Sequence, residues 1–159
     1  MLRRLVCFFI CAGMLLGCAE AEQEVVLPGG RYALDLPDWM EYSDAVDGEA
    51  GIEAYVSKDL EMDYFIYSRE AAAEQGMTGS LREIAKARKQ AGMDAQVRKL
   101  NGMEMLVYRM VDEEDETPCI GYLFEDGEWL IEIDFWYATE EAAEQTKEII
   151  SSIREVAGD

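Results

Sequence analysis

Two carboxylates stand two positions apart in Trp129–Tyr137, a segment rich in aromatic and apolar residues. In an extended chain Glu132 and Asp134 fall on the same side, roughly 7 Å apart, because side chains alternate along a strand. Glycoside hydrolases use two carboxylates about 5–10 Å apart, one of them as the general acid. The spacing therefore permits a carboxylate-dependent hydrolase. Because any acidic protein contains such pairs, we favour a solvated or salt-bridged strand face and expect no catalytic residue.

Three aromatic residues are expected to accompany these carboxylates. Tyr55, Tyr108 and Trp136 occupy strand positions opposite the most apolar faces. If no helix covers that side, the aromatic and acidic side chains form an exposed patch with the composition of a binding surface. If a helix or segment 69–79 covers it, they belong to the core, and the sequence leaves both arrangements open. The candidate binding surface consists of Tyr55, Tyr108, Glu132, Asp134 and Trp136.

The chain contains no histidine. This absence excludes catalysis by Ser-His or Cys-His pairs and most catalytic zinc sites. The acid run Asp112–Glu116 offers the oxygen ligands that calcium prefers, but it lacks the spaced acidic positions and the glycine of a preformed calcium loop. We therefore expect a solvated hairpin tip at this run, with no metal site and no cofactor.

Four cysteines occur, and three of them lie near the N-terminus: Cys7, Cys11 and Cys18. Cys119 would therefore stand alone in the folded domain, which would have no internal disulfide. A lone cysteine in an exported chain can be a reactive thiol, but burial as a small apolar residue is the commoner role. We expect Cys119 to be half-buried in a strand and not catalytic.

The N-terminal segment has the pattern of an export signal. Arg3 and Arg4 precede an unbroken apolar run, Leu5–Leu16, and Gly17 and Cys18 follow it. A charged start, a short apolar core and a small-residue cleavage site are typical of a secretory signal peptide. The run is shorter than the about 20 residues that cross a bilayer as a helix. Ordinary secretion with cleavage nearby, or an uncleaved anchor, also fits this pattern.

The end of the segment, Leu15–Cys18, resembles the cleavage box of bacterial lipoprotein signals, with Leu16 in place of the usual small residue. The resemblance implies cleavage before Cys18 and attachment of lipid, including palmitate, to that cysteine. Residues 1–17 would then be a lipoprotein signal peptide, and residues 18–30 an acidic tether. The protein would lie on the extracytoplasmic face of the cell membrane, anchored by its lipid.

The formal net charge is −20 at pH 7, and 50% of the residues are hydrophobic. So negative a surface repels nucleic acid and anionic membranes, and attachment to a bilayer would therefore depend on the lipid. A length of 159 residues is enough for one domain with its own core. We expect a protein partner or a small extracytoplasmic ligand, and no nucleic acid.

Apolar residues alternate along several segments and follow helical spacing in two others. Helices are expected at Ser80–Ala91, where Ser80 and Glu83 form a capping box, and after Thr139. Short turns such as Asn101-Gly102 favour antiparallel pairing of successive strands. The predicted fold is α+β: an antiparallel sheet of about six to seven strands packed with two amphipathic helices, on one face or as an α/β/α sandwich. The strands are expected at 31–36, 51–58, 63–68, 94–100, 103–111, 119–124 and 129–137.

Several stretches together match a known pattern: Tyr32–Pro37 followed by Trp39, the helix after Ser80, Asn101-Gly102 leading into Met103–Tyr108, Gly121-Tyr122 through Trp129, and a closing helix that ends near Ile153. Over residues 31–157 the chain resembles the PsbP-like family, which includes a photosystem II subunit, a Ran-binding nuclear import factor and small bacterial lipoproteins. The resemblance implies a single α+β domain that acts in binding or assembly and has no catalytic residues. Fold alone does not identify the ligand.

Overall fold

The computed structural model describes residues 22–27, 29–43, 53–112 and 116–156. The signal peptide expected at 1–17, the lipid site expected at Cys18 and the centre of the acid run Asp112–Glu116 lie outside the described residues. Among the residues described, no helix is both long and apolar enough to cross a membrane.

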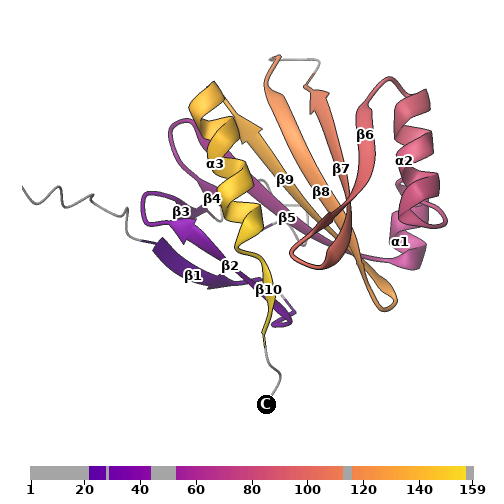
Figure 1. Ribbon diagram of the computed structural model, residues 1–159, viewed down its shortest axis with the longest axis horizontal. Helices are drawn as coiled ribbons and strands as arrows, with labels where there is room; N and C mark the ends of the chain where they lie inside the picture. Colours follow the sequence, from indigo (N-terminus) through magenta and orange to yellow (C-terminus); the bar gives the residue numbers. More distant parts are fainter. Residues whose placement is uncertain (1–21, 28, 44–52, 113–115, 157–159) are drawn as a thin grey trace, which may run out of the picture.

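Seven strands form one antiparallel sheet in the order β3-β4-β5-β9-β8-β7-β6 (Figure 1). Strands β6 to β9 follow one another as a meander, and β5 pairs with β9, which places β9 at the centre of the sheet. At the β6–β7 turn Asn101 and Gly102 have φ angles of 47° and 83°, which a two-residue hairpin of this kind requires. The strands are β3 (Glu41–Ser43), β4 (Glu53–Val56), β5 (Leu60–Ser68), β6 (Asp94–Leu100), β7 (Met103–Val111), β8 (Pro118–Asp126) and β9 (Trp129–Tyr137).

The two predicted helices are present, and a short third one precedes them. The capping box of Ser80 and Glu83 is formed at the start of the first predicted helix. Thr139 caps the last helix by accepting a hydrogen bond of 3.1 Å from the backbone nitrogen of Ala142. The helices are α1 (Arg69–Glu74), α2 (Leu81–Gln90) and α3 (Glu140–Ser151).

A second, three-stranded sheet has the order β1-β2-β10, with β1 at Glu22–Val26, β2 at Tyr32–Pro37 and β10 at Arg154–Glu155. The small sheet and α3 cover one face of the large sheet, whereas α1 and α2 cover the other (Figure 1). This arrangement confirms the α+β class, with an amphipathic helix on each face.

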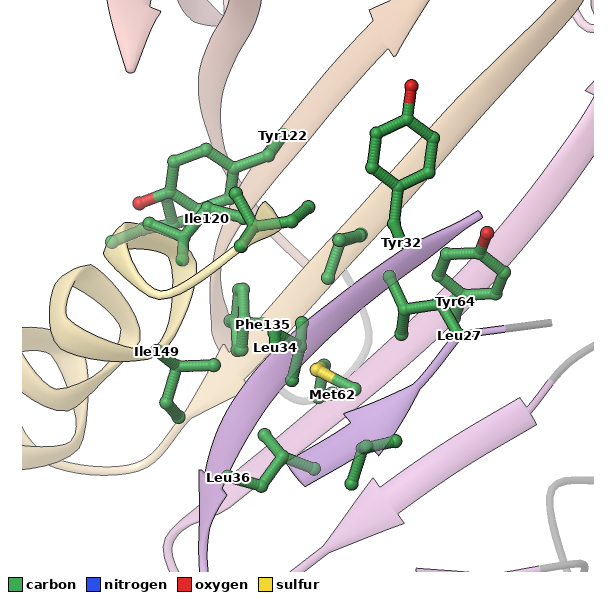
Figure 2. Packing of buried hydrophobic residues seen from close by; sticks show 14 of the residues in the cluster. Leu27, Tyr32, Leu34, Leu36, Met62, Tyr64, Ile120, Tyr122, Phe135 and Ile149 are labelled. Carbon is green, nitrogen blue, oxygen red and sulfur yellow. The ribbon is translucent and has the colours of Figure 1, made fainter. Parts of the chain in front are cut away.

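Most of the apolar core lies between the large sheet and the layer formed by α3 and the small sheet (Figure 2). Leu34 of β2, Phe135 of β9 and Ile149 of α3 meet there and are almost completely buried. A smaller core lies on the other face, where Ile84 of α2 packs in one cluster with Leu123 of β8. Both faces of the central strands are therefore covered.

The expectation of an acidic tether over residues 18–30 is wrong for Glu22–Val26, which forms β1. This strand pairs with β2 along its whole length, and Val25 and Leu27 are buried in the larger core. Buried and exposed residues alternate along the segment. The segment is so short and so rich in acids that this alternation is not evident from the sequence. Because β1 and β10 pair with β2, the first expected strand belongs to the small sheet and not to the large one.

The last helix also ends earlier than predicted. It stops at Ser151, before the expected end near Ile153, and Arg154 lies in β10. The guanidinium of Arg154 donates to Asp35 of β2 at 2.8 Å and to Glu24 of β1. The hydroxyl of Ser152 accepts a hydrogen bond of 2.8 Å from the backbone of Asp35. These contacts turn the chain out of the helix and into the small sheet.

The packing of α3 gives a direct test of the fold. Ile150 is buried in the larger core, whereas Lys147 is exposed on the same helix. Ile150→Ala should lower the free energy of unfolding by about 2–5 kcal/mol, since it removes buried methyl groups and leaves a cavity. Lys147→Ala should change it by less than about 0.5 kcal/mol. Urea unfolding followed by circular dichroism measures both values, and equal effects of the two changes would contradict this packing.

Candidate functional site

The site begins with a tyrosine that lies across the sheet. Tyr108 of β7 faces Gly121 of β8, which in turn faces Asp134 of β9. A Cβ at position 121 would lie only 2.0 Å from Cζ of Tyr108, so no other residue fits at this position without displacing the ring. The missing side chain at Gly121 therefore lets the tyrosine reach over β8 and place its hydroxyl at β9.

Two carboxylates and one arginine surround that hydroxyl. The hydroxyl oxygen of Tyr108 lies 2.8 Å from Oε1 of Glu132 and also contacts Oδ1 of Asp134. Nη2 of Arg88, from α2, donates to the same Glu132 oxygen at 2.6 Å. The Arg88 guanidinium carbon lies 3.6 Å from the centre of the Tyr108 ring, a cation–π contact. We call these four residues the Tyr108 cluster.

The contacts of the cluster favour a proton on one carboxyl group. A phenol has one hydrogen to donate, yet Tyr108 contacts an oxygen of both Glu132 and Asp134. Burial raises the pKa of Asp134 to about 7, and the nearby charge of Glu132 adds to this effect. The Tyr108 hydroxyl donates toward these carboxylates, and when Asp134 is protonated its carboxyl group can donate to Tyr108 while Tyr108 donates to Glu132. Arg88 then balances the charge of Glu132.

The cluster forms part of the wall of an open cleft of about 360 Å³. The cleft lies between α2 and the sheet, and Met77 from the α1–α2 connection and Met93 after α2 also line it. Met110 completes the apolar part of its lining. The cleft therefore has flexible, apolar walls around one buried polar group, a composition suited to binding a small molecule.

A third buried carboxylate lies beside the cluster. Asp63 of β5 faces Asp134 across the β5–β9 ladder, and its Oδ2 accepts a hydrogen bond of 3.0 Å from the indole of Trp136. Burial, together with the charge of Glu61, raises the pKa of Asp63 to about 6, against the opposing effect of the Trp136 hydrogen bond. This face of β5 and β9 therefore carries two carboxyl groups that gain protons near neutral pH.

Four of the five residues of the predicted binding surface come together on this face: Tyr108, Glu132, Asp134 and Trp136. Tyr55 does not join them. It stands opposite Met62 on the α3 side of the sheet, where its ring meets Tyr42 at 5.6 Å.

The patch is not an exposed one, because Tyr108, Glu132 and Asp134 are buried. The alternative in which a helix covers this side is therefore the correct one for these three residues. Arg88 was not expected in the site. The sequence feature that could have placed it there is its position on the apolar stripe of the predicted helix, after Leu81 and Ile84.

The cluster is poorly arranged for glycoside hydrolysis. In such enzymes the scissile bond and a water molecule lie between the two carboxylates. Here the Tyr108 hydroxyl occupies the space between Glu132 and Asp134, and Arg88 neutralises Glu132. Among the residues described, no group of histidine, cysteine or acidic side chains could hold a metal ion. Glu132 and Asp134 are therefore both engaged inside the cluster, whereas Nη1 of Arg88 and Oδ1 of the neighbouring Asp63 are buried without a hydrogen-bond partner in the part of the chain that the structure describes.

The pKa of Asp134 generates a pH prediction. Between about pH 4 and pH 7 the folded chain holds a proton on Asp134 that the unfolded chain has released, so the free energy of unfolding should fall as the pH rises. Asp134→Asn cannot ionise and still donates to Tyr108. Relative to the wild type it should gain stability on going from about pH 4 to about pH 8, by up to about 4 kcal/mol.

Urea unfolding at three pH values in this range measures the effect. Asp94→Asn is the matched control, since Asp94 is exposed on β6, and it should keep the wild-type pH profile. If Asp134→Asn has the same pH profile as the wild type, the proton is not held on Asp134.

Cys119 is a free thiol, fully buried on β8. Burial and the charges of Asp134, Asp63 and Glu132 raise its pKa far above the ordinary value. Iodoacetamide should therefore leave Cys119 unmodified in the folded protein and alkylate it in urea, since the thiolate is the reactive form. Peptide mass spectrometry distinguishes it from the other cysteines. Alkylation at equal rates in the two conditions would show that the thiol is accessible.

No protein-family model and no curated protein matches the sequence. Solved structures do match the fold. The solution structure of cyanobacterial PsbP (CyanoP) from Synechocystis sp. PCC 6803 aligns with a TM-score of 0.58 at 15% identity, over 92% of this chain and 97% of that chain. A crystal structure from Bacteroides thetaiotaomicron VPI-5482 aligns with a TM-score of 0.58 at 15% identity, over 86% of this chain.

This chain spans 49% of the length of the Bacteroides protein, whereas it matches the cyanobacterial protein almost from end to end. At 15% identity both likenesses concern the fold alone. They agree with the resemblance noted in the sequence, and the chain has a PsbP-like fold.

Proposed function

We propose that this protein is a lipid-anchored, extracytoplasmic module that binds a partner or ligand and does not catalyse a reaction. The observation that carries the proposal is the closed hydrogen-bond network of Glu132 and Asp134, which leaves no free acid–base pair at the cleft. The PsbP-like fold supports the same conclusion, because the resemblance noted in the sequence implies binding or assembly.

The anchor is proposed from the sequence Leu15–Cys18, with lipid on Cys18. The position of β1 limits the distance between the proposed lipid and the folded domain. Glu22 begins β1 and follows Cys18 by four positions, a length of extended chain of at most roughly 14 Å. The domain would therefore lie directly against the bilayer surface, with the small sheet nearest to the lipid. Its negative charge would disfavour contact with anionic lipid headgroups.

A carboxylate-dependent hydrolase is the second candidate function. One observation favours it: the pKa of Asp134 is raised to about 7, within the range that suits a general acid. Asp134 also lines the cleft. Against it, Asp134 shares its proton with Tyr108, whose hydroxyl lies where a substrate bond would have to be. A hydrolase would need Tyr108 to move away from both carboxylates, which would leave a charged Glu132 with Arg88 alone.

Replacement of the proposed lipid site tests the anchor. Cys18→Ser should abolish incorporation of radioactive palmitate and leave the precursor uncleaved, because the lipoprotein peptidase acts at a lipidated cysteine. Gel mobility and autoradiography of labelled cells measure both results. Cys119→Ser is the matched control and should still be labelled and processed. Label that persists in Cys18→Ser, or that is absent from the wild type, would contradict the anchor.

A further inference from the structure

A second hollow, of about 470 Å³, lies at the junction of the two sheets. Residues of the turn between β1 and β2, the start of β2, the end of β5 and the hairpin of β8 and β9 line it. We call it the junction groove. It is separate from the cleft beside the Tyr108 cluster, which lies on the opposite face of the large sheet, under α2.

The junction groove exposes large apolar side chains. Trp129 is 48% exposed and Ile66 is 37% exposed, and they line the groove together with Ile131 and the ring of Tyr32. Exposed tryptophans at the centre of a hollow are frequent anchors of protein–protein contacts, because they bury much area with few rotatable bonds. The groove can therefore accept an apolar side chain.

Acidic side chains surround these apolar residues. Asp126 forms an ion pair of 2.7 Å with Arg31, whose side chain is 63% exposed. Glu128 is exposed in the turn beside Trp129, and Glu155 faces Tyr32 across the β2–β10 ladder. Burial, with the charges of Asp126 and Glu155, raises the pKa of Tyr32. The acidic rim of the groove therefore consists of the exposed Glu128 and Glu155, which lie next to the lining residues, whereas Arg31 is an exposed cation of the lining itself.

The net charge of the whole chain limits which kind of molecule can bind in the junction groove. A second copy would also carry a formal net charge of −20, so two copies repel each other. An anionic bilayer is disfavoured for the same reason. A cationic surface is attracted to this protein over long range and can pair with the acidic rim. Asp126 is buried and already paired with Arg31, so a cationic partner would pair with the exposed Glu128 and Glu155.

We propose that the junction groove is the docking site for a cationic protein segment, in which an apolar side chain packs on Trp129 and flanking lysine or arginine residues pair with the acidic rim. The inference rests on the proposed function as a binding module and gives its partner a chemical class. It does not depend on the lipid, so the two proposals can fail separately.

The test uses the purified protein, in phosphatidylcholine nanodiscs if it carries lipid and free in buffer if it does not, and a fluorescein-labelled peptide of alternating lysine and leucine. Fluorescence anisotropy measures binding, with empty nanodiscs as the blank and a peptide of alternating glutamate and leucine as the comparison. The lysine peptide should bind, and its affinity should fall with added salt. Trp129→Ala should weaken it at least about tenfold, as loss of a central anchor does. The glutamate peptide should not bind.

Two further variants make the result specific. Val111→Ala removes an exposed apolar side chain that does not line the groove, and it should leave the affinity unchanged. Glu128→Lys reverses one charge at the rim and should weaken the lysine peptide while the unfolding midpoint is retained. Equal binding of both peptides, or equal losses in Trp129→Ala and Val111→Ala, would overturn the proposal. So would a dimer in sedimentation that Trp129→Ala dissociates, since the occupant would then be a second copy.

Discussion

Two carboxylates on the central strand determine much of this structure. Glu132 and Asp134 are almost completely buried on β9, which has neighbours on both sides and a covered layer on each face. A buried carboxylate needs hydrogen bonds, an opposite charge or a proton. Tyr108 supplies the hydrogen bonds, Arg88 supplies the charge, and a raised pKa keeps a proton on Asp134.

Each of these contacts depends on the sequence of another strand or helix. Tyr108 reaches β9 because β8 has a glycine where the ring crosses it. Arg88 reaches Glu132 because the capping box starts α2 at Leu81 and so fixes which residues of the helix face the sheet. The opposite face of β9 packs by apolar contact, with Ile133 and Phe135 in the larger core. One strand thus joins a polar layer and an apolar layer.

Local signals in the sequence were sufficient for most of the fold. The Asn101-Gly102 turn, the Ser80 cap and the alternation in Trp129–Tyr137 each depend on neighbours along the chain, and each is confirmed. The strands β1, β3 and β10 were missed because a short strand has too few residues to show a period. The pairing of β10 with β2 depends in addition on a contact between segments far apart in the sequence.

The candidate site was predicted only in part, because it also depends on contacts between segments that are far apart in the sequence. The spacing of Glu132 and Asp134 places both on one face, as found, but it does not show that α2 covers them. Tyr55 was assigned to the wrong face, because its position was judged from the polarity of its own strand. The register with Met62, a contact between strands, determines the side on which it lies.

The central claim is that Asp134 holds a proton within a closed network and does not serve as a free acid or base. Carbon-13 NMR of the Asp134 carboxyl carbon, followed through a pH titration of the folded protein, measures its ionisation directly. The account predicts a midpoint near 7 and the loss of that resonance change in Asp134→Asn. A midpoint near the ordinary value of 3.8 for aspartate would contradict the account, because Asp134 would then be ionised at neutral pH and could not donate to Tyr108.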